Sequence, residues 1–156
     1  GIARSPMPVL RSPIMSFESE GLELIHTPGH SADHHVVWDA DRETLFAGDL
    51  FLAVKVRVAR PGEDPGRLVD SLRRAASLHP KRVFDAHRGE IPSPVTSLLA
   101  KAAWLEETIG PIDRAVAEGR DDASIRDEIL GREEWVSYVS RGDLSKLNFV
   151  RAVRGY

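Results

Sequence analysis

The feature that most constrains this chain is a change in hydrophobic pattern near residue 94. Before it, short apolar runs end at turn residues and are typical of strands: Leu22 to His26, His35 to Trp38, Thr44 to Ala47 and Arg82 to Ala86. After it, apolar residues recur at helical spacing. The pattern predicts an extended lead-in at residues 1–20, a mixed α/β part over 21–92 and a helical region over 93–156.

Local signals also predict where the helices begin. Asp64-Pro65 is typical of a helix start, because Asp is a good N-cap and Pro is favoured in the first turn. This helix is expected to end at His79-Pro80, and Ser93-Pro94 predicts the next start. The second and third apolar runs, separated by a short polar turn, predict a β-hairpin.

Further signals lie in the helical region. Gly110-Pro111 predicts a kink or break, because Pro lacks a backbone donor and clashes with the preceding turn. Asp122 is the expected cap of another short helix. We expect Trp104 and Trp135 to be core residues of this region.

Composition narrows the classes of function. The chain has 156 residues, a net charge of -3 and no cysteine. Disulfides and thiolate ligands are therefore excluded, and any metal site must use His, Asp and Glu. The charge argues against nucleic-acid binding. No apolar run approaches the length that spans a bilayer, so no membrane partner is expected, and a cytoplasmic location fits the lack of cysteine.

Four of the six histidines fall within ten residues. The spacing of His26, His30 and His34 would suit one helix face, but Pro28-Gly29 forbids that helix. The better interpretation places His30 on a tight turn after a strand, where its side chain can leave the sheet edge and point into a cleft.

Two further strands end in the same manner. Asp49 follows Gly48 at the end of the third apolar run, and His87 follows the fourth. Taken singly, a strand-end Asp is usually a turn residue and a lone His a surface residue. Recurrence at three strand ends favours a shared site, and imidazole and carboxylate are ligands that zinc takes.

These segments resemble the metallo-β-lactamase superfamily. Thr27-Pro28-Gly29-His30-Ser31 is similar to the family segment whose His binds the first metal. Leu45-Phe46-Ala47-Gly48-Asp49 is similar to the strand whose Asp bridges both metals, and Ala86-His87-Arg88-Gly89 to the segment whose His binds the second. The separations agree with this, being 19 residues from His30 to Asp49 and 38 from there to His87.

The chain also departs from the family. The family's His-x-His-x-Asp-His segment, which lies upstream of the Thr-Pro-Gly-His segment and supplies further ligands, does not occur here. The resemblance therefore implies the C-terminal half of an αβ/βα sandwich followed by a helical tail. His30, Asp49 and His87 would form a partial site that an N-terminal half completes.

The resemblance implies a metal-dependent hydrolase. One or two zinc ions, with manganese or iron as alternatives, would activate water and polarise the substrate. Asp49 would be the catalytic residue, because it would bridge the metals and orient the water. A small ester, thioester or lactone is the preferred small-molecule substrate, since the helical tail resembles that of thioesterase-like members.

The rival hypothesis is a non-catalytic or truncated domain. Half a sandwich leaves one apolar face of the sheet exposed, and we expect the missing half, a second protein chain or a second copy in a homodimer to cover it.

Other polar residues near these segments receive structural interpretations. Asp33 and His34 could orient His30, but a solvated hairpin start is favoured. Lys55, Arg57 and Arg60 could contact an anionic substrate, but a solvated loop is favoured.

Overall fold

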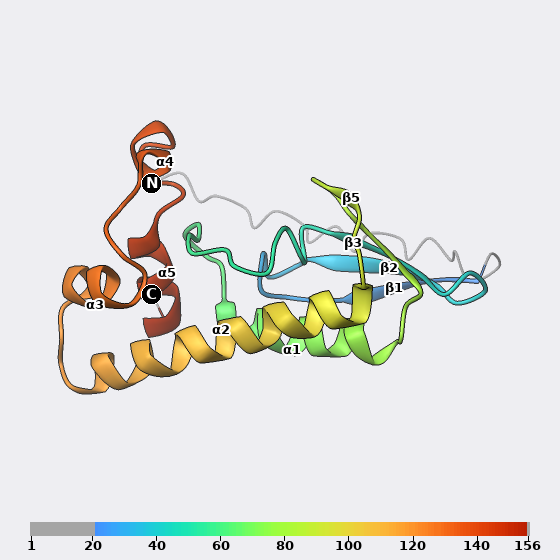
Figure 1. Ribbon diagram of the computed structural model, residues 1–156, viewed down its shortest axis with the longest axis horizontal. Helices are drawn as coiled ribbons and strands as arrows, with labels where there is room; N and C mark the ends of the chain where they lie inside the picture. Colours follow the sequence, from blue (N-terminus) through green and yellow to red (C-terminus); the bar gives the residue numbers. More distant parts are fainter. Residues whose placement is uncertain (1–20, 156) are drawn as a thin grey trace, which may run out of the picture.

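The computed structural model describes residues 21–155, so the predicted lead-in at residues 1–20 lies outside the described residues. Within the described part, five strands form one mixed sheet in the order β1-β2-β3-β4-β5 (Figure 1). Their bounds are Leu22–His26, His35–Asp39, Thr44–Gly48, Arg82–Asp85 and Gly89–Glu90. All neighbours pair antiparallel except β3 and β4, which are parallel.

The predicted strands and hairpin are confirmed, and the short β5 is an addition. Alternation along the strands turns one set of side chains inward, including the buried Ile25, Val36, Leu45 and Val83. The β2–β3 turn is closed by Asp39, whose buried carboxylate accepts from the backbone amide of Arg42.

Two helices cover the inward face of the sheet, α1 (Pro65–Ser77) and α2 (Pro94–Ala117), which pack along each other (Figure 1). The Asp64 side chain accepts from the Arg67 amide, so the predicted cap of α1 is confirmed. Ser93 makes no such bond, because it adopts a left-handed conformation with φ of 47°, although Pro94 does open α2.

The helical region contains three more helices at one end of the molecule, α3 (Asp122–Ile129), α4 (Trp135–Val139) and α5 (Lys146–Arg154) (Figure 1). The expected break at Gly110-Pro111 is wrong, because α2 runs through Pro111 as one element. Proline removes only one ladder bond, and the buried Leu105, Ile112 and Ala115 keep both halves on one packed face.

Two smaller expectations in this region are also wrong. The cap of α3 is Asp121, whose side chain accepts from the Ser124 amide, and not Asp122. Trp104 packs partly buried against the core, whereas Trp135 is 72% exposed on the short α4, which has no buried residue.

The opposite face of the sheet carries no helix among the described residues. Leu24, Val37, Phe46 and Phe84 stand in register across four adjacent strands on this face. Leu24 is 60% exposed and Phe46 47% exposed, and the Phe46 and Phe84 rings stack with their centres 5.7 Å apart. This row is called the open face below.

Among the helices between residues 21 and 155, none combines the length and the apolar character that crossing a membrane requires.

Candidate metal centre

The three residues predicted from the strand ends lie together. The Asp49 carboxylate places Oδ2 3.5 Å from His30 Nε2 and Oδ1 2.8 Å from His87 Nε2. Each carboxylate oxygen therefore faces a different imidazole. Their role as metal ligands stays a prediction.

The sheet topology explains why Asp49 and His87 meet. Strands β3 and β4 are parallel neighbours, with Gly48 paired to Asp85, so both chains leave the sheet at the same edge. The Ala86 amide donates to the Gly48 carbonyl at 3.0 Å and extends this pairing by one step. The His87 side chain is 63% exposed, so the centre opens to solvent on that side.

His30 reaches the centre from the turn after β1. Gly29 lies so close to α1 that a Cβ at this position would stand 2.6 Å from Leu68 backbone atoms. The Gly29 carbonyl also accepts from the Asp64 amide at 2.7 Å. The turn that carries His30 is thus fixed against the start of α1.

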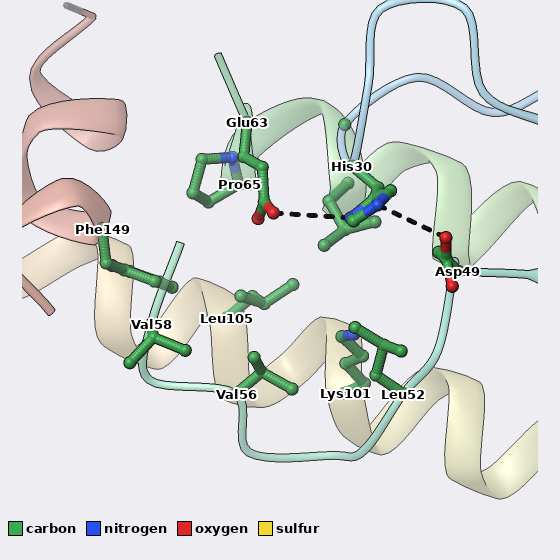
Figure 2. A pocket seen from close by; sticks show the side chains of 12 residues that line it. His30, Asp49, Leu52, Val56, Val58, Glu63, Pro65, Lys101, Leu105 and Phe149 are labelled. Carbon is green, nitrogen blue, oxygen red and sulfur yellow. Dashed lines mark ion pairs between the residues drawn. The ribbon is translucent and has the colours of Figure 1, made fainter. Parts of the chain in front are cut away.

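Glu63 lies on the far side of His30 from Asp49 (Figure 2). Its Oε1 is 3.4 Å from His30 Nδ1, at the distance of an ion pair. Burial raises the pKa of Glu63, and the nearby His30 opposes this shift. A carboxylate against Nδ1 orients the imidazole so that Nε2 faces Asp49, an arrangement common around metal-binding histidines.

His34 holds the backbone of Asp49. The Asp49 amide donates to His34 Nε2 at 3.3 Å, so Nδ1 carries the proton and faces Thr27 Oγ1 at 2.9 Å. Burial lowers the pKa of His34, which favours this neutral form. The expected solvated position of His34 is therefore wrong, and it orients Asp49 rather than His30. Asp33 is exposed, as expected.

Gly48 makes the approach of His34 possible. It has a φ of +53°, and a Cβ there would stand 3.1 Å from His34 Nε2. The glycine before Asp49 thus serves the turn and also leaves room for the imidazole.

A narrow cavity of about 20 Å³ lies beside His30 and Asp49, large enough for about one water molecule (Figure 2). Its apolar wall consists of Leu52, Val56, Val58, Leu68, Leu105 and Phe149. Glu63 and Lys101 add polar groups. Lys101 is 2% exposed, and burial lowers its pKa to about 8.

The loop lysine and arginines stand apart from this cavity. Lys55, Arg57 and Arg60 are exposed, which agrees with the solvated loop that the sequence favours. Arg60 forms an exposed ion pair with Asp143.

The donor set fits part of a metal centre. His and Asp suit zinc-class ions, and Asp49 has one oxygen available toward each imidazole. Between residues 21 and 155, however, no group of three His, Asp or Glu side chains surrounds one common point. The residues therefore fit two partial sites that share Asp49, and each needs further donors.

Some residues at the centre were not anticipated from the sequence. Glu63 carries no local signal, because only the fold brings it to His30. Lys101 could have been found, since it falls on the apolar stripe with Leu98, Ala102 and Leu105, where a charged residue requires a buried partner.

Comparison with known proteins finds relatives that are named as lactamase-like proteins. The chain is 32% identical over 88 residues to the Beta-lactamase-like protein 2 homolog of Drosophila melanogaster, covering 56% of this chain and 29% of that protein. It is 38% identical over 80 residues to the Lactamase-like protein nscB of Trichophyton verrucosum, covering 51% and 27%. The chain thus spans less than a third of the length of these two relatives.

A solved structure agrees on the fold. A metallo-beta-lactamase family protein from Thermus thermophilus superposes with a TM-score of 0.62 at 18% identity, covering 85% of this chain and 42% of that one. The sequence model of the Metallo-beta-lactamase superfamily matches residues 10–87, which is half of the chain and includes all three converging residues. This chain belongs to the metallo-beta-lactamase superfamily.

Proposed function

We propose that this chain carries one part of a metal-dependent hydrolase centre, which acts on a small ester, thioester or lactone. One observation carries the proposal: the two oxygens of Asp49 face the Nε2 atoms of two different histidines. A shared carboxylate between two ions is the arrangement of two-metal hydrolytic sites.

In this proposal His30 and His87 would each hold one ion, and Asp49 would contribute a carboxylate oxygen toward each. Zinc is preferred, with manganese or iron as alternatives. A divalent ion bound here supplies Lewis-acid polarisation of the substrate and acidifies water. The chain's own contribution is placement, since Glu63 orients His30 and His34 holds the Asp49 backbone.

The remaining ligands would come from outside the described residues 21–155. Zinc sites take three or four protein ligands per ion, whereas within residues 21–155 each partial site has one histidine and the shared Asp49. We propose that an N-terminal half or a second protein chain supplies the missing donors.

The substrate class rests on the cavity. Its wall beside Asp49 is mostly apolar, and its volume of about 20 Å³ holds about one water molecule, so the substrate would lie at its mouth. Such a wall favours an apolar acyl substituent at its mouth over a highly charged phosphodiester.

The test is zinc binding by the 156-residue chain, measured by titration calorimetry and by elemental analysis of the dialysed protein. His30→Ala, His87→Ala and Asp49→Ala should each weaken binding, with the largest loss for Asp49→Ala because it touches both partial sites. His35→Ala is the matched control, since this exposed histidine lies on β2, its side chain bonds to the Asp33 carbonyl and its ring centre lies 4.9 Å from that of His26. Equal zinc binding by all five proteins would refute the proposal.

A second candidate function is supported by the open face. A row of apolar side chains across four strands, with Leu24 and Phe46 about half exposed, is typical of an interaction surface. We propose that a partner covers this face, either the N-terminal half of the fold or a second copy of the chain.

Sedimentation measurements test this candidate. Phe46→Asp should lower the association of the chain with itself, whereas Leu99→Asp should not, because Leu99 is 42% exposed on the helical side. A wild-type chain that stays monomeric and binds no apolar dye at high concentration would argue against an interaction surface.

A further inference from the structure

Asp85, the last residue of β4, has a buried carboxylate that accepts from three backbone amides. Its Oδ1 accepts from the amides of His87 at 2.8 Å and Arg88 at 3.1 Å. Its Oδ2 accepts from the amide of Leu52 at 2.7 Å. Asp85 is 5% exposed, so these three hydrogen bonds offset the cost of removing its carboxylate from water.

The three amides belong to two different loops. His87 and Arg88 lie in the turn after β4, and Leu52 lies in the loop after β3, three residues beyond Asp49. The carboxylate therefore joins the segment that carries Asp49 to the segment that carries His87.

The loop after Asp49 needs such support. Leu52 has a φ of +56°, a left-handed conformation that a leucine adopts only when its surroundings impose it. Buried Lys101 of α2 holds the two preceding residues, because its Nζ donates to the carbonyls of Leu50, at 3.2 Å, and Phe51.

Parallel pairing alone does not place Asp49 on His87. The pairing of β3 with β4 is irregular after Phe46, where the register shifts before Gly48 meets Asp85. The bond from the Ala86 amide to the Gly48 carbonyl extends the pairing by one step, and beyond it the Asp85 carboxylate bonds both loops.

We propose that Asp85 is a positioning residue, which fixes Asp49 and His87 relative to each other by binding both loops at once. This inference rests on the proposed function, in which Asp49 is the ligand shared by both metals and His87 is the ligand of the second metal.

The test is Asp85→Asn, which keeps the shape of the side chain but leaves one acceptor oxygen. This oxygen can serve the turn after β4 or the Leu52 amide, and the amide nitrogen repels the other loop. The matched control is Asp39→Asn, because Asp39 is a buried carboxylate of the same sheet that closes the β2–β3 turn, and it makes no contact with this centre.

The first readout is NMR of the metal-free chain. In Asp85→Asn at least one of the Leu52, His87 and Arg88 amides should exchange about tenfold faster, and the nuclear Overhauser contact between the His87 ring and the Asp49 side chain should disappear. Asp39→Asn should keep both features. Should Asp85→Asn fail to fold, Asp85→Ser provides a smaller side chain with a single acceptor for the same comparison.

The second readout is the affinity for zinc alone, measured by competition with a chelator. Asp85→Asn should lose about tenfold in affinity and Asp39→Asn should not. Persistence of the His87–Asp49 contact in metal-free Asp85→Asn overturns the inference, whether or not the zinc affinity changes. If alanine substitution of His30, Asp49 or His87 leaves the zinc affinity unchanged, the proposed function is overturned instead. The His87–Asp49 contact in the metal-free chain then still decides the role of Asp85.

Discussion

Gly48 gives the sharpest quantitative test of how Asp49 is held. Substitution by alanine places an L-residue at a φ of +53°, which costs about 1–2 kcal/mol. The new Cβ would also stand 3.1 Å from His34 Nε2, so the imidazole must shift by a few tenths of an ångström, and we expect this shift to break its 3.3 Å bond from the Asp49 amide. That bond contributes about 1 kcal/mol. We therefore expect Gly48→Ala to lower the free energy of unfolding by about 2–3 kcal/mol.

Urea denaturation measures this loss, and Gly119→Ala isolates the backbone part. Gly119 has a φ of +77° and no atom near its would-be Cβ, so its substitution should cost only the conformational strain. With an m-value of about 2 kcal/mol/M, Gly48→Ala should lower the midpoint by about 1–1.5 M. In a His34→Ala background its cost should fall to that of Gly119→Ala. An equal cost of the two glycine substitutions, or an excess that survives without His34, would refute the reasoning.

Three more predictions concern the fold around the centre. Gly29→Ala should cost more than about 3 kcal/mol in urea denaturation, because its Cβ would meet Leu68 backbone atoms at 2.6 Å, and a loss under about 1 kcal/mol would contradict the close packing. Since the pKa of Lys101 is lowered to about 8, the folded chain releases this proton before the unfolded chain does. The unfolding free energy of the wild type should thus rise by about 2 kcal/mol relative to Lys101→Met between about pH 8 and pH 10, and a constant difference would count against the buried charge. Leu45→Ala on the covered face should cost about 3 kcal/mol, and Leu24→Ala on the open face under about 0.5 kcal/mol in the monomer; equal losses would show that both faces are covered.

Local patterns were sufficient where a structural element depends on neighbours in sequence. The short apolar runs over residues 22–26 and 35–38 predicted strands, and Asp64-Pro65 predicted the capped start of α1. The recurrence of His30, Asp49 and His87 at strand ends predicted their convergence, because strands of one sheet that leave at the same edge bring their following residues together.

Packing against distant elements overruled the same kind of reasoning elsewhere. Pro111 failed to end α2 because the buried residues around it stabilise one continuous helix against the loss of a single bond. Trp135 was expected in the core from its type alone, but it lies on a five-residue helix with no buried face.

The sequence by itself determined the order of the strands and helices, the family of the chain and the three residues that meet at the sheet edge. Only the tertiary structure decided how these residues are held. Glu63 reaches His30 from the residue before the cap of α1, His34 bonds the Asp49 amide, and Asp85 with Lys101 fixes the loop beyond it. These contacts join residues up to 51 positions apart. A buried charge or imidazole needs a hydrogen-bond partner because packing removes it from water, and only the folded chain brings that partner close.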